Sequence, residues 1–219
     1  MIFINLKTYQ IGTGEQAKIF CLEAEKLMHS LQVPLTILAQ AVDIRLLTQN
    51  TALPIWAQHV DDVEYGKFTG STMPFGIMQA GASGTMINHT EHKIIPKDIK
   101  SIINHYQSNN FGILLSSRTP EEVIKFDEER PTYLSYEPSL YVGMKSNILD
   151  ISPGLVVTLV NKIKSPLIIG AGIHKPEDIV KGFDVGAKGF LISSSILMDT
   201  DPIGKLREFM VAYRTKIGN

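Results

Sequence analysis

The sequence has few of the features that nucleic-acid-binding or membrane proteins need. It contains 21 Lys and Arg against 22 Asp and Glu, a net charge of −1, so no excess positive charge attracts nucleic acid or an anionic bilayer. No apolar run approaches the roughly 18 residues of a membrane-spanning helix. A bound anion is therefore expected to be held by local geometry rather than by the overall charge of the protein.

The sequence also has a single cysteine, Cys21, which excludes an internal disulfide and leaves no second thiol for a metal pair. Cys21 lies between Phe20 and Leu22 in a helical pattern, so we expect a small buried side chain there. The N-terminal Met-Ile-Phe-Ile-Asn has a strand pattern, without a basic start followed by an apolar stretch. These features predict a cytoplasmic protein with neither a membrane nor a nucleic acid as partner.

Short apolar runs recur along the chain at nearly regular spacing. They are too continuous for half-exposed strands and too short for helices, so they predict parallel strands buried on both faces. A hydrophobic fraction of 44% with 20% charged residues is typical of a globular protein with a large core. The runs are Ile2–Leu6, Leu35–Ala39, Pro54–Gln58, Gly84–Asn88, Phe111–Leu115, Tyr133–Tyr136, Leu167–Gly170 and Gly189–Ile192.

Amphipathic stretches alternate with these runs, as in Glu15–Leu31, where Ala17, Phe20, Ala24 and Leu27 share one stripe. Further helices are predicted over Pro96–Tyr106, Pro120–Phe126, Ile151–Lys164, Pro176–Phe183 and Pro202–Tyr213. The alternation shows no Gly/Ser linker and no composition shift, which predicts one parallel α/β domain over residues 1–219. A doubly wound sheet alternates in the same way, but the number of strand signals favours a single (β/α)8 barrel.

Polar and small residues follow several of these runs, at the strand ends where such barrels place their active sites. Asn5–Lys7 ends in a lysine. Partly removing its charge from water at a barrel mouth costs free energy unless the lysine pairs with an anion. Asn88–Glu91 brings a histidine and a carboxylate, and Tyr136–Pro138 brings a second carboxylate before a proline. Gly170–Ile173 and Ile192–Ser195 have small side chains, which favour close approach of backbone N–H groups to a phosphate.

Taken together and in this order, these motifs resemble the triosephosphate isomerase family, in particular its shorter archaeal type. The resemblance covers the whole chain. Ala57–Asp61 with Thr69-Gly70 resembles the third strand and the loop that reaches into a partner subunit. Tyr136–Pro138 followed by Val142-Gly143 resembles the base and its mobile lid, and Gly189–Ser194 resembles a phosphate loop. The resemblance implies a TIM barrel that isomerises dihydroxyacetone phosphate and D-glyceraldehyde 3-phosphate, as in glycolysis and gluconeogenesis.

The resemblance also implies roles for individual residues. Glu137 is then the base, His89 the electrophile and Lys7 the cationic clamp, with Glu91 and Thr69 as supporting residues. The implied substrate-binding residues are Asn5, Lys7, Gly143, Gly172, Ser193 and Ser194. No metal and no cofactor is implied, and the interface loop implies self-association as a homodimer or homotetramer.

The residues suit this chemistry for reasons of their own. Isomerising a ketose phosphate to an aldose phosphate needs a base that moves a carbon-bound proton and donors for an enediolate intermediate. One carboxylate can take the proton from one carbon and return it to the next. A neutral His89 just past a buried strand is easier to desolvate than a cationic one. The sequence offers no dinucleotide fingerprint that would indicate a redox cofactor.

Some positions depart from the family pattern. The lid segment Ser139–Lys145 keeps only Gly143 of the usual Gly-Thr-Gly tip, and Thr90 stands where the family usually has serine. His92 stands where many members carry arginine, and His59 is expected to be structural, near Lys7 or an interface. Ser193-Ser194 replaces a glycine pair, or an Ala-Ser pair in archaeal-type members.

Two other functions stay open at this point. One is another phosphosugar enzyme on the same barrel, such as a phosphoribosyl-type isomerase or an aldolase. A Schiff-base aldolase needs a lysine at the end of the sixth strand, where this chain has Glu137. The other is a catalytically silent barrel that binds phosphosugars, for which the unusual lid is the only support.

Overall fold

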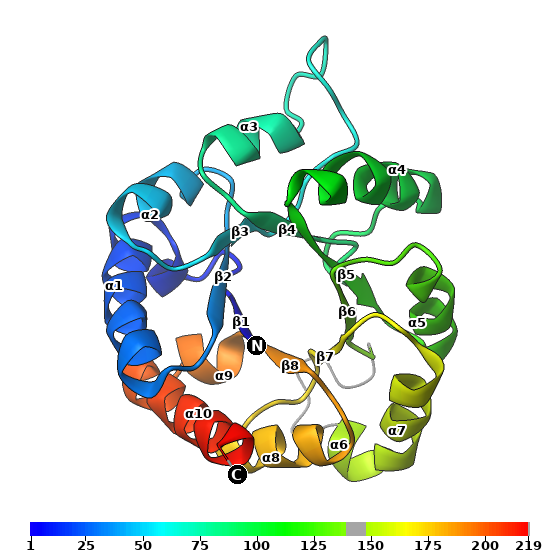
Figure 1. The fold of residues 1–219 in the computed structure, drawn as a ribbon. Helices are drawn as coiled ribbons and strands as arrows, with labels where there is room; N and C mark the ends of the chain where they lie inside the picture. Colours follow the sequence, from blue (N-terminus) through cyan, green and yellow to red (C-terminus); the bar gives the residue numbers. More distant parts are fainter. Residues whose placement is uncertain (139–147, 219) are drawn as a thin grey trace.

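A computed structural model describes residues 1–138 and 148–218, and its strands form a closed parallel barrel in the order β1 to β8. The strands are β1 Ile2–Asn5, β2 Leu35–Ala39, β3 Ile55–Ala57, β4 Gly84–Ile87, β5 Gly112–Ser117, β6 Tyr133–Tyr136, β7 Leu167–Ile169 and β8 Gly189–Ile192. Pairing of Ile2 with Phe190 and of Ile4 with Ile192 joins β1 to β8 and closes the barrel. Figure 1 shows the strands as an inner ring with helices outside them. The predicted (β/α)8 TIM barrel is confirmed.

The helices lie between successive strands and after the last one. They are α1 Gly14–Leu31, α2 Ile44–Asn50, α3 Pro74–Gln79, α4 Pro96–Tyr106, α5 Pro120–Asp127, α6 Ile148–Ile151, α7 Pro153–Lys162, α8 Pro176–Asp184, α9 Ser194–Leu197 and α10 Pro202–Ile217, with short 3-10 turns η1 Gln10–Gly12 and η2 Gln107–Asn109. Thr119 and Asp201 cap α5 and α10, since their side chains accept hydrogen bonds from Glu122 N and Gly204 N. Among the described residues, no helix has the length and apolar character needed to cross a bilayer.

The structure corrects the sequence prediction at several elements. The single helix expected over Ile151–Lys164 is wrong, because Ser152 separates α6 from α7. Pro153 has no backbone N–H to continue a helix but suits the first turn of a new one. The helix α2 was not predicted, since only Ile44 and Leu47 of its short span are buried and give little periodic signal. Strand β5 begins one residue later and ends two residues later than expected.

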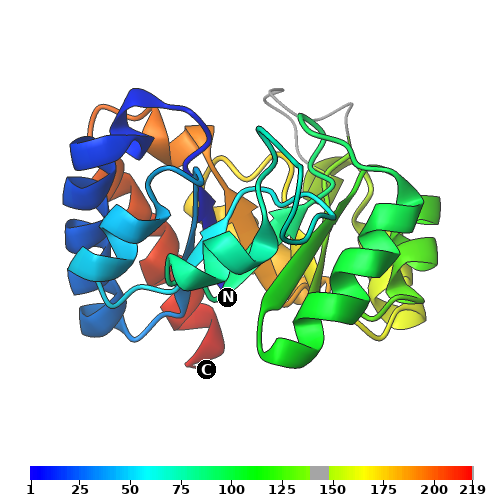
Figure 2. The same ribbon diagram turned by 90° about the horizontal axis from the view of Figure 1, so that it is seen from above.

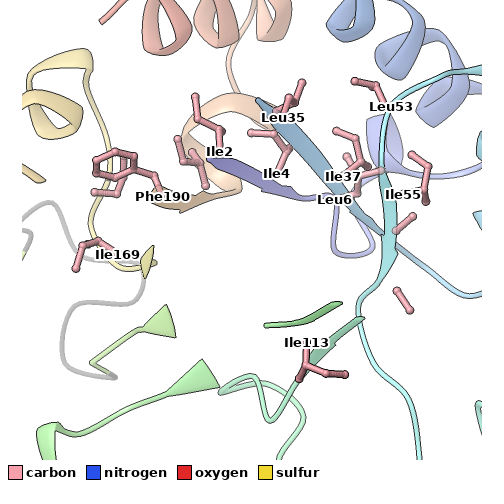
Figure 3. Packing of buried hydrophobic residues seen from close by; sticks show 14 of the residues in the cluster. Ile2, Ile4, Leu6, Leu35, Ile37, Leu53, Ile55, Ile113, Ile169 and Phe190 are labelled. Atoms are coloured by element: carbon pink, nitrogen blue, oxygen red, sulfur yellow. The ribbon is translucent and has the colours of Figure 1, made fainter. Parts of the chain in front are cut away.

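Alternate residues of each strand point to opposite faces, which creates two apolar clusters. The outer cluster lies between strands and helices and includes Ile2, Ile4, Leu35, Ile37, Ile55, Ile113, Ile169 and Phe190, which Figure 3 labels. The inner cluster fills the barrel with Phe3, Leu38, Trp56, Met86, Leu114, Ile168 and Leu191. A Cβ atom on Gly84 or Gly112 would lie within 2.4 Å of the Trp56 ring, so glycine on β4 and β5 makes room for that side chain.

The inward positions become polar toward the carboxyl ends of the strands. On β1, the inward residue after Phe3 is Asn5, which is 3% exposed. On β6, Ser135 and then Glu137 follow the inward Tyr133, and both are buried. Figure 2 shows the barrel from the side, with the loop that follows β1 at the edge opposite the C-terminus. The packed apolar interior therefore forms the floor of a polar site at one end of the barrel.

The segment between β3 and α3 extends beyond the ring of helices (Figure 1). Tyr65 and Phe68 in this segment are 75% and 50% exposed, while Val63 and Met73 are half-buried. The Tyr65 ring stacks on Phe75, with their centroids 5.8 Å apart. The segment thus presents aromatic surface outside the barrel.

Candidate active site

A pocket opens at the carboxyl ends of β1, β4, β6, β7 and β8. Its lining among the described residues is Asn5, Lys7, His89, Glu137, Gly170, Ala171, Gly172, Ile173, His174, Leu191, Ile192, Ser193, Ser194 and Ser195. An adjoining pocket is lined by Lys7 and Glu91, together with His59 and His92. The structure thus brings together the described residues that the sequence nominated as catalytic or substrate-binding. Glu91 lies at the edge of this group.

The backbone holds Lys7 in an unusual conformation. Its φ of 47° lies in the left-handed region, which a non-glycine residue adopts only at some expense. Lys7 N donates to Asn5 Oδ1 at 3.0 Å, and Gln58 Nε2 donates to Lys7 O at 3.0 Å. The side chain then reaches Glu91, with Nζ 2.5 Å from Oε1. The strained turn therefore directs a cation along the pocket wall.

The hydrogen bonds of His89 identify its protonated nitrogen. The side chain is 8% exposed, and Glu91 N donates to His89 Nδ1 at 3.2 Å. A ring nitrogen that accepts carries no proton, so a neutral His89 has its proton on Nε2. His89 Nε2 lies 3.2 Å from Glu137 Oε2 and donates to it. The ring therefore presents an N–H group to the pocket.

Glu137 is 3% exposed, directly after β6. Its Oε1 lies 2.9 Å from the Ser135 hydroxyl oxygen. Burial alone raises the pKa of Glu137, but the hydrogen bonds from His89 and Ser135, together with the nearby Ser116 hydroxyl, outweigh it and hold that pKa below its ordinary value. The carboxylate is therefore ionised at neutral pH although it is buried.

The pocket end formed by β7 and β8 consists of small residues. Gly172 has a φ of 76°, a conformation that suits glycine. Ser193 Oγ donates to Asn5 O at 2.7 Å, and Ser195 Oγ donates to Ile173 O at 2.8 Å. Two of the three serine hydroxyls are therefore engaged in bonds within the protein. The short helix α9 begins at Ser194.

Three nominated residues are not among the described residues that line this pocket, and one of them, Glu91, lines only the adjoining pocket. Thr69 is exposed in the segment between β3 and α3. Gly143 and the rest of the lid segment Ser139–Lys145 lie outside the described residues. Among the described residues, no group of three or more His, Cys, Asp or Glu side chains is arranged to hold a metal ion.

Sequence reasoning missed three residues that support the site. Gln58 holds the backbone of Lys7, while Ser135 and Ser116 lie next to the carboxylate of Glu137. The two-residue spacing between Ser135 and Glu137 was an available signal, because it places both side chains on one face of a strand. Ser116 gave no such signal, since its position depends on how β5 pairs with β6.

The sequence matches a known protein family over most of its length. The family model described as triosephosphate isomerase matches residues 1–208. The chain belongs to the triosephosphate isomerase family. It is therefore an isomerase whose substrate is a triose phosphate.

Several archaeal triosephosphate isomerases resemble the chain over nearly its full length. The protein of Methanocaldococcus jannaschii is 27% identical over 215 residues, covering 96% of this chain and 98% of the relative. The protein of Saccharolobus solfataricus is 29% identical, covering 97% of this chain and 95% of the relative. The protein of Thermoplasma volcanium is also 29% identical, covering 95% of this chain and 98% of the relative. These matches agree with the expected short archaeal type.

Proposed function

We propose that Glu137 and His89 carry the interconversion of dihydroxyacetone phosphate and D-glyceraldehyde 3-phosphate through an enediolate. One observation carries this assignment: a buried carboxylate and a buried imidazole face each other in one pocket, with Glu137 Oε2 3.2 Å from His89 Nε2. The first can move a proton and the second can donate to the oxygen that becomes negative.

Glu137 acts as the base. It is ionised at neutral pH, because the hydrogen bonds that it accepts hold its pKa below the ordinary value despite its burial. It takes a proton from one substrate carbon and returns it to the neighbouring carbon, so no second base is required. Its burial excludes water that would otherwise exchange with the transferred proton.

His89 acts as the electrophile. Because Nδ1 accepts from Glu91 N, the ring presents its Nε2–H to the pocket. A bound substrate carbonyl takes this hydrogen bond from Glu137 and leaves Oε2 ready to accept the carbon-bound proton. The N–H group then stabilises the oxygen of the enediolate.

Lys7 and the small residues at β7 and β8 bind the phosphate. Lys7 supplies positive charge. Among the described residues, the pocket lining contains no arginine that could form two parallel hydrogen bonds to the phosphate dianion. Gly172, Ser193 and Ser194 have small side chains, which favours contacts from backbone N–H groups. We assign Gly143 to the same role from its place in the lid motif. Asn5 supports the clamp by accepting from Lys7 N.

The proposed active unit is a homodimer or homotetramer. The segment between β3 and α3, which includes Thr69, extends beyond the helices and exposes Tyr65 and Phe68. Apolar surface of this kind is unfavourable in water unless a partner covers it. We further propose that residues 1–219 form one domain, since β1 pairs with β8 and α1 packs on α10.

A coupled assay tests the proposal. The purified protein is given dihydroxyacetone phosphate, and the glyceraldehyde 3-phosphate formed is oxidised by an NAD-dependent dehydrogenase whose NADH is monitored. Glu137→Gln removes the base, so kcat is expected to fall by about 10²–10⁴-fold with far less change in KM. Glu177→Gln, an exposed change on α8, is the matched control and should leave both constants unchanged. Activity in Glu137→Gln above a tenth of the wild-type value would place the base elsewhere.

A further inference from the structure

Two buried serine hydroxyls lie next to the proposed base. Ser135 and Ser116 are 0% and 1% exposed. Ser135 Oγ lies 2.9 Å from Glu137 Oε1 and 2.9 Å from Ser116 Oγ. Ser135 precedes Glu137 by two residues, so both side chains point into the barrel. Ser116 is the register partner of Ser135 on the neighbouring strand β5.

The number of protons determines the direction of these hydrogen bonds. An ionised carboxylate can only accept, so the Ser135 hydroxyl directs its proton at Glu137 Oε1. Because a hydroxyl has one proton, Ser135 has none left for Ser116. The 2.9 Å contact between the two serines then requires the proton of Ser116. The hydrogen bonds run from Ser116 to Ser135 to Glu137.

We propose that Ser135 and Ser116 are positioning residues for Glu137, a relay of two hydroxyls that fixes one carboxylate oxygen and leaves the other for the substrate proton. The proposal rests on the assignment of Glu137 as the base. Ser135 acts on Glu137 directly, and Ser116 acts through Ser135 by orienting its hydroxyl. Neither serine is among the described residues that line the pocket.

The surrounding backbone makes this relay rigid. Asn88 Nδ2 donates to Ser116 O at 2.9 Å, and Glu137 N donates to Ser117 O at 2.8 Å. These bonds connect the ends of β4, β5 and β6. Both hydroxyls therefore belong to the barrel wall, and their positions do not depend on a surface loop.

The relay also affects the protonation of the base. The hydrogen bond from Ser135, polarised by the one that Ser135 accepts from Ser116, favours the charged carboxylate over the neutral acid, and the buried surroundings strengthen both bonds. This agrees with a pKa of Glu137 below its ordinary value despite burial, to which His89 also contributes. Loss of the relay should thus disturb both the orientation of Glu137 and the pH at which it loses its proton.

Ser135→Ala tests the proposal through the pH profile of kcat/KM, whose acid limb reports the base in the free enzyme. The acid limb is expected to move to higher pH. On the acid limb, kcat/KM should fall about 10- to 100-fold, the effect of losing a hydrogen bond to a charged group. The matched control is Ser117→Ala, another buried serine on β5, whose hydroxyl has no hydrogen-bond partner among the described residues. Its acid limb should coincide with that of the wild type.

A double-mutant cycle separates a relay from two independent contacts. Ser116→Ala should move the acid limb less than Ser135→Ala does. The combined variant should be no worse than Ser135→Ala alone, because Ser116 acts only through Ser135. Losses that multiply would overturn the relay. Should Ser135→Ala fail to fold by circular dichroism, Ser135→Cys keeps the side-chain volume with a weaker donor and should shift the acid limb in the same direction.

Glu137→Gln, measured in parallel, separates the failure of this proposal from that of the proposed function. An inactive Glu137→Gln with an unmoved acid limb in both serine variants would overturn the relay alone. An active Glu137→Gln would overturn the assignment of the base, and the relay with it.

Discussion

Gly170 on the β7 side of the pocket lies directly against the side chain of Glu137. A Cβ atom at position 170 would lie 2.4 Å from Glu137 Cγ and 2.8 Å from Cδ, distances that no real Cβ contact tolerates. Gly170 N also donates to Tyr136 O at 3.1 Å, so the two strands cannot easily separate. The absence of a side chain at Gly170 is therefore what permits Glu137 to occupy its position.

Gly170→Ala should consequently displace the base. We expect kcat to fall by about 100-fold, because a misplacement of about 1 Å in a reacting group has an effect of that size. The measurement is the coupled assay, with circular dichroism to verify folding. Gly154→Ala on α7 is the matched control, since nothing lies within 4 Å of a Cβ atom there. Equal activity in both variants would show that the Gly170 contact does not position Glu137.

A charge in the segment between β3 and α3 should disturb self-association. In Thr69→Glu, a carboxylate would enter the proposed interface, where desolvation is costly, so association and activity should both decrease. Light scattering and the coupled assay at the same protein concentration measure the two effects. Val42→Glu adds the same charge at a position that is 82% exposed and should change neither. A fully active wild-type monomer would contradict the proposed oligomer.

Substitutions at Ser194 distinguish backbone from side-chain binding of the phosphate. Ser194→Ala should weaken the binding of 2-phosphoglycolate, an analogue of the enediolate, by about 1 kcal/mol, the worth of one neutral hydrogen bond. Ser194→Asp should weaken it much more, because a carboxylate then faces the phosphate. Calorimetric affinities provide the test. Equal losses of affinity in the two variants would show that the Ser194 hydroxyl, rather than the backbone, binds the phosphate.

His59 should make the protein less stable as the pH falls below about 6.5. Its ring stacks on His92 with centroids 3.9 Å apart, and its Nε2 lies 3.1 Å from Asp61 Oδ1. Burial and the neighbouring His92 lower the pKa of His59 below its ordinary value of 6.5, and the opposing effect of Asp61 does not restore it. The unfolded chain therefore binds this proton at a higher pH than the folded protein does.

The free energy of unfolding should accordingly be highest above pH 6.5 and decrease as the pH falls through the pKa of the folded state. Urea titrations at a series of pH values measure this slope. His59→Gln should make the slope shallower below pH 6.5, whereas His105→Gln, an exposed change on α4, should not. Asp61, whose pKa lies below 3.8, titrates at lower pH and does not contribute in this window. An unchanged slope in His59→Gln would contradict the prediction.

Much of the fold was present in the sequence because its signals are local. A run such as Leu35–Ala39 is apolar on both faces, and this alone predicts a parallel strand covered on both sides. The residues that follow the strands, such as Lys7, His89 and Glu137, were predictable as a group. In a parallel barrel the carboxyl ends of all strands meet at one face.

Only the tertiary structure decided how these groups act on one another. The ion pair of Lys7 with Glu91 joins residues 84 positions apart, and the contact of Ser116 with Ser135 depends on the register of β5 against β6. The protonated nitrogen of His89 follows from a hydrogen bond that no sequence pattern specifies. Residue types and strand periodicity are properties of short segments, whereas register, barrel closure and hydrogen-bond partners arise when distant segments pack together.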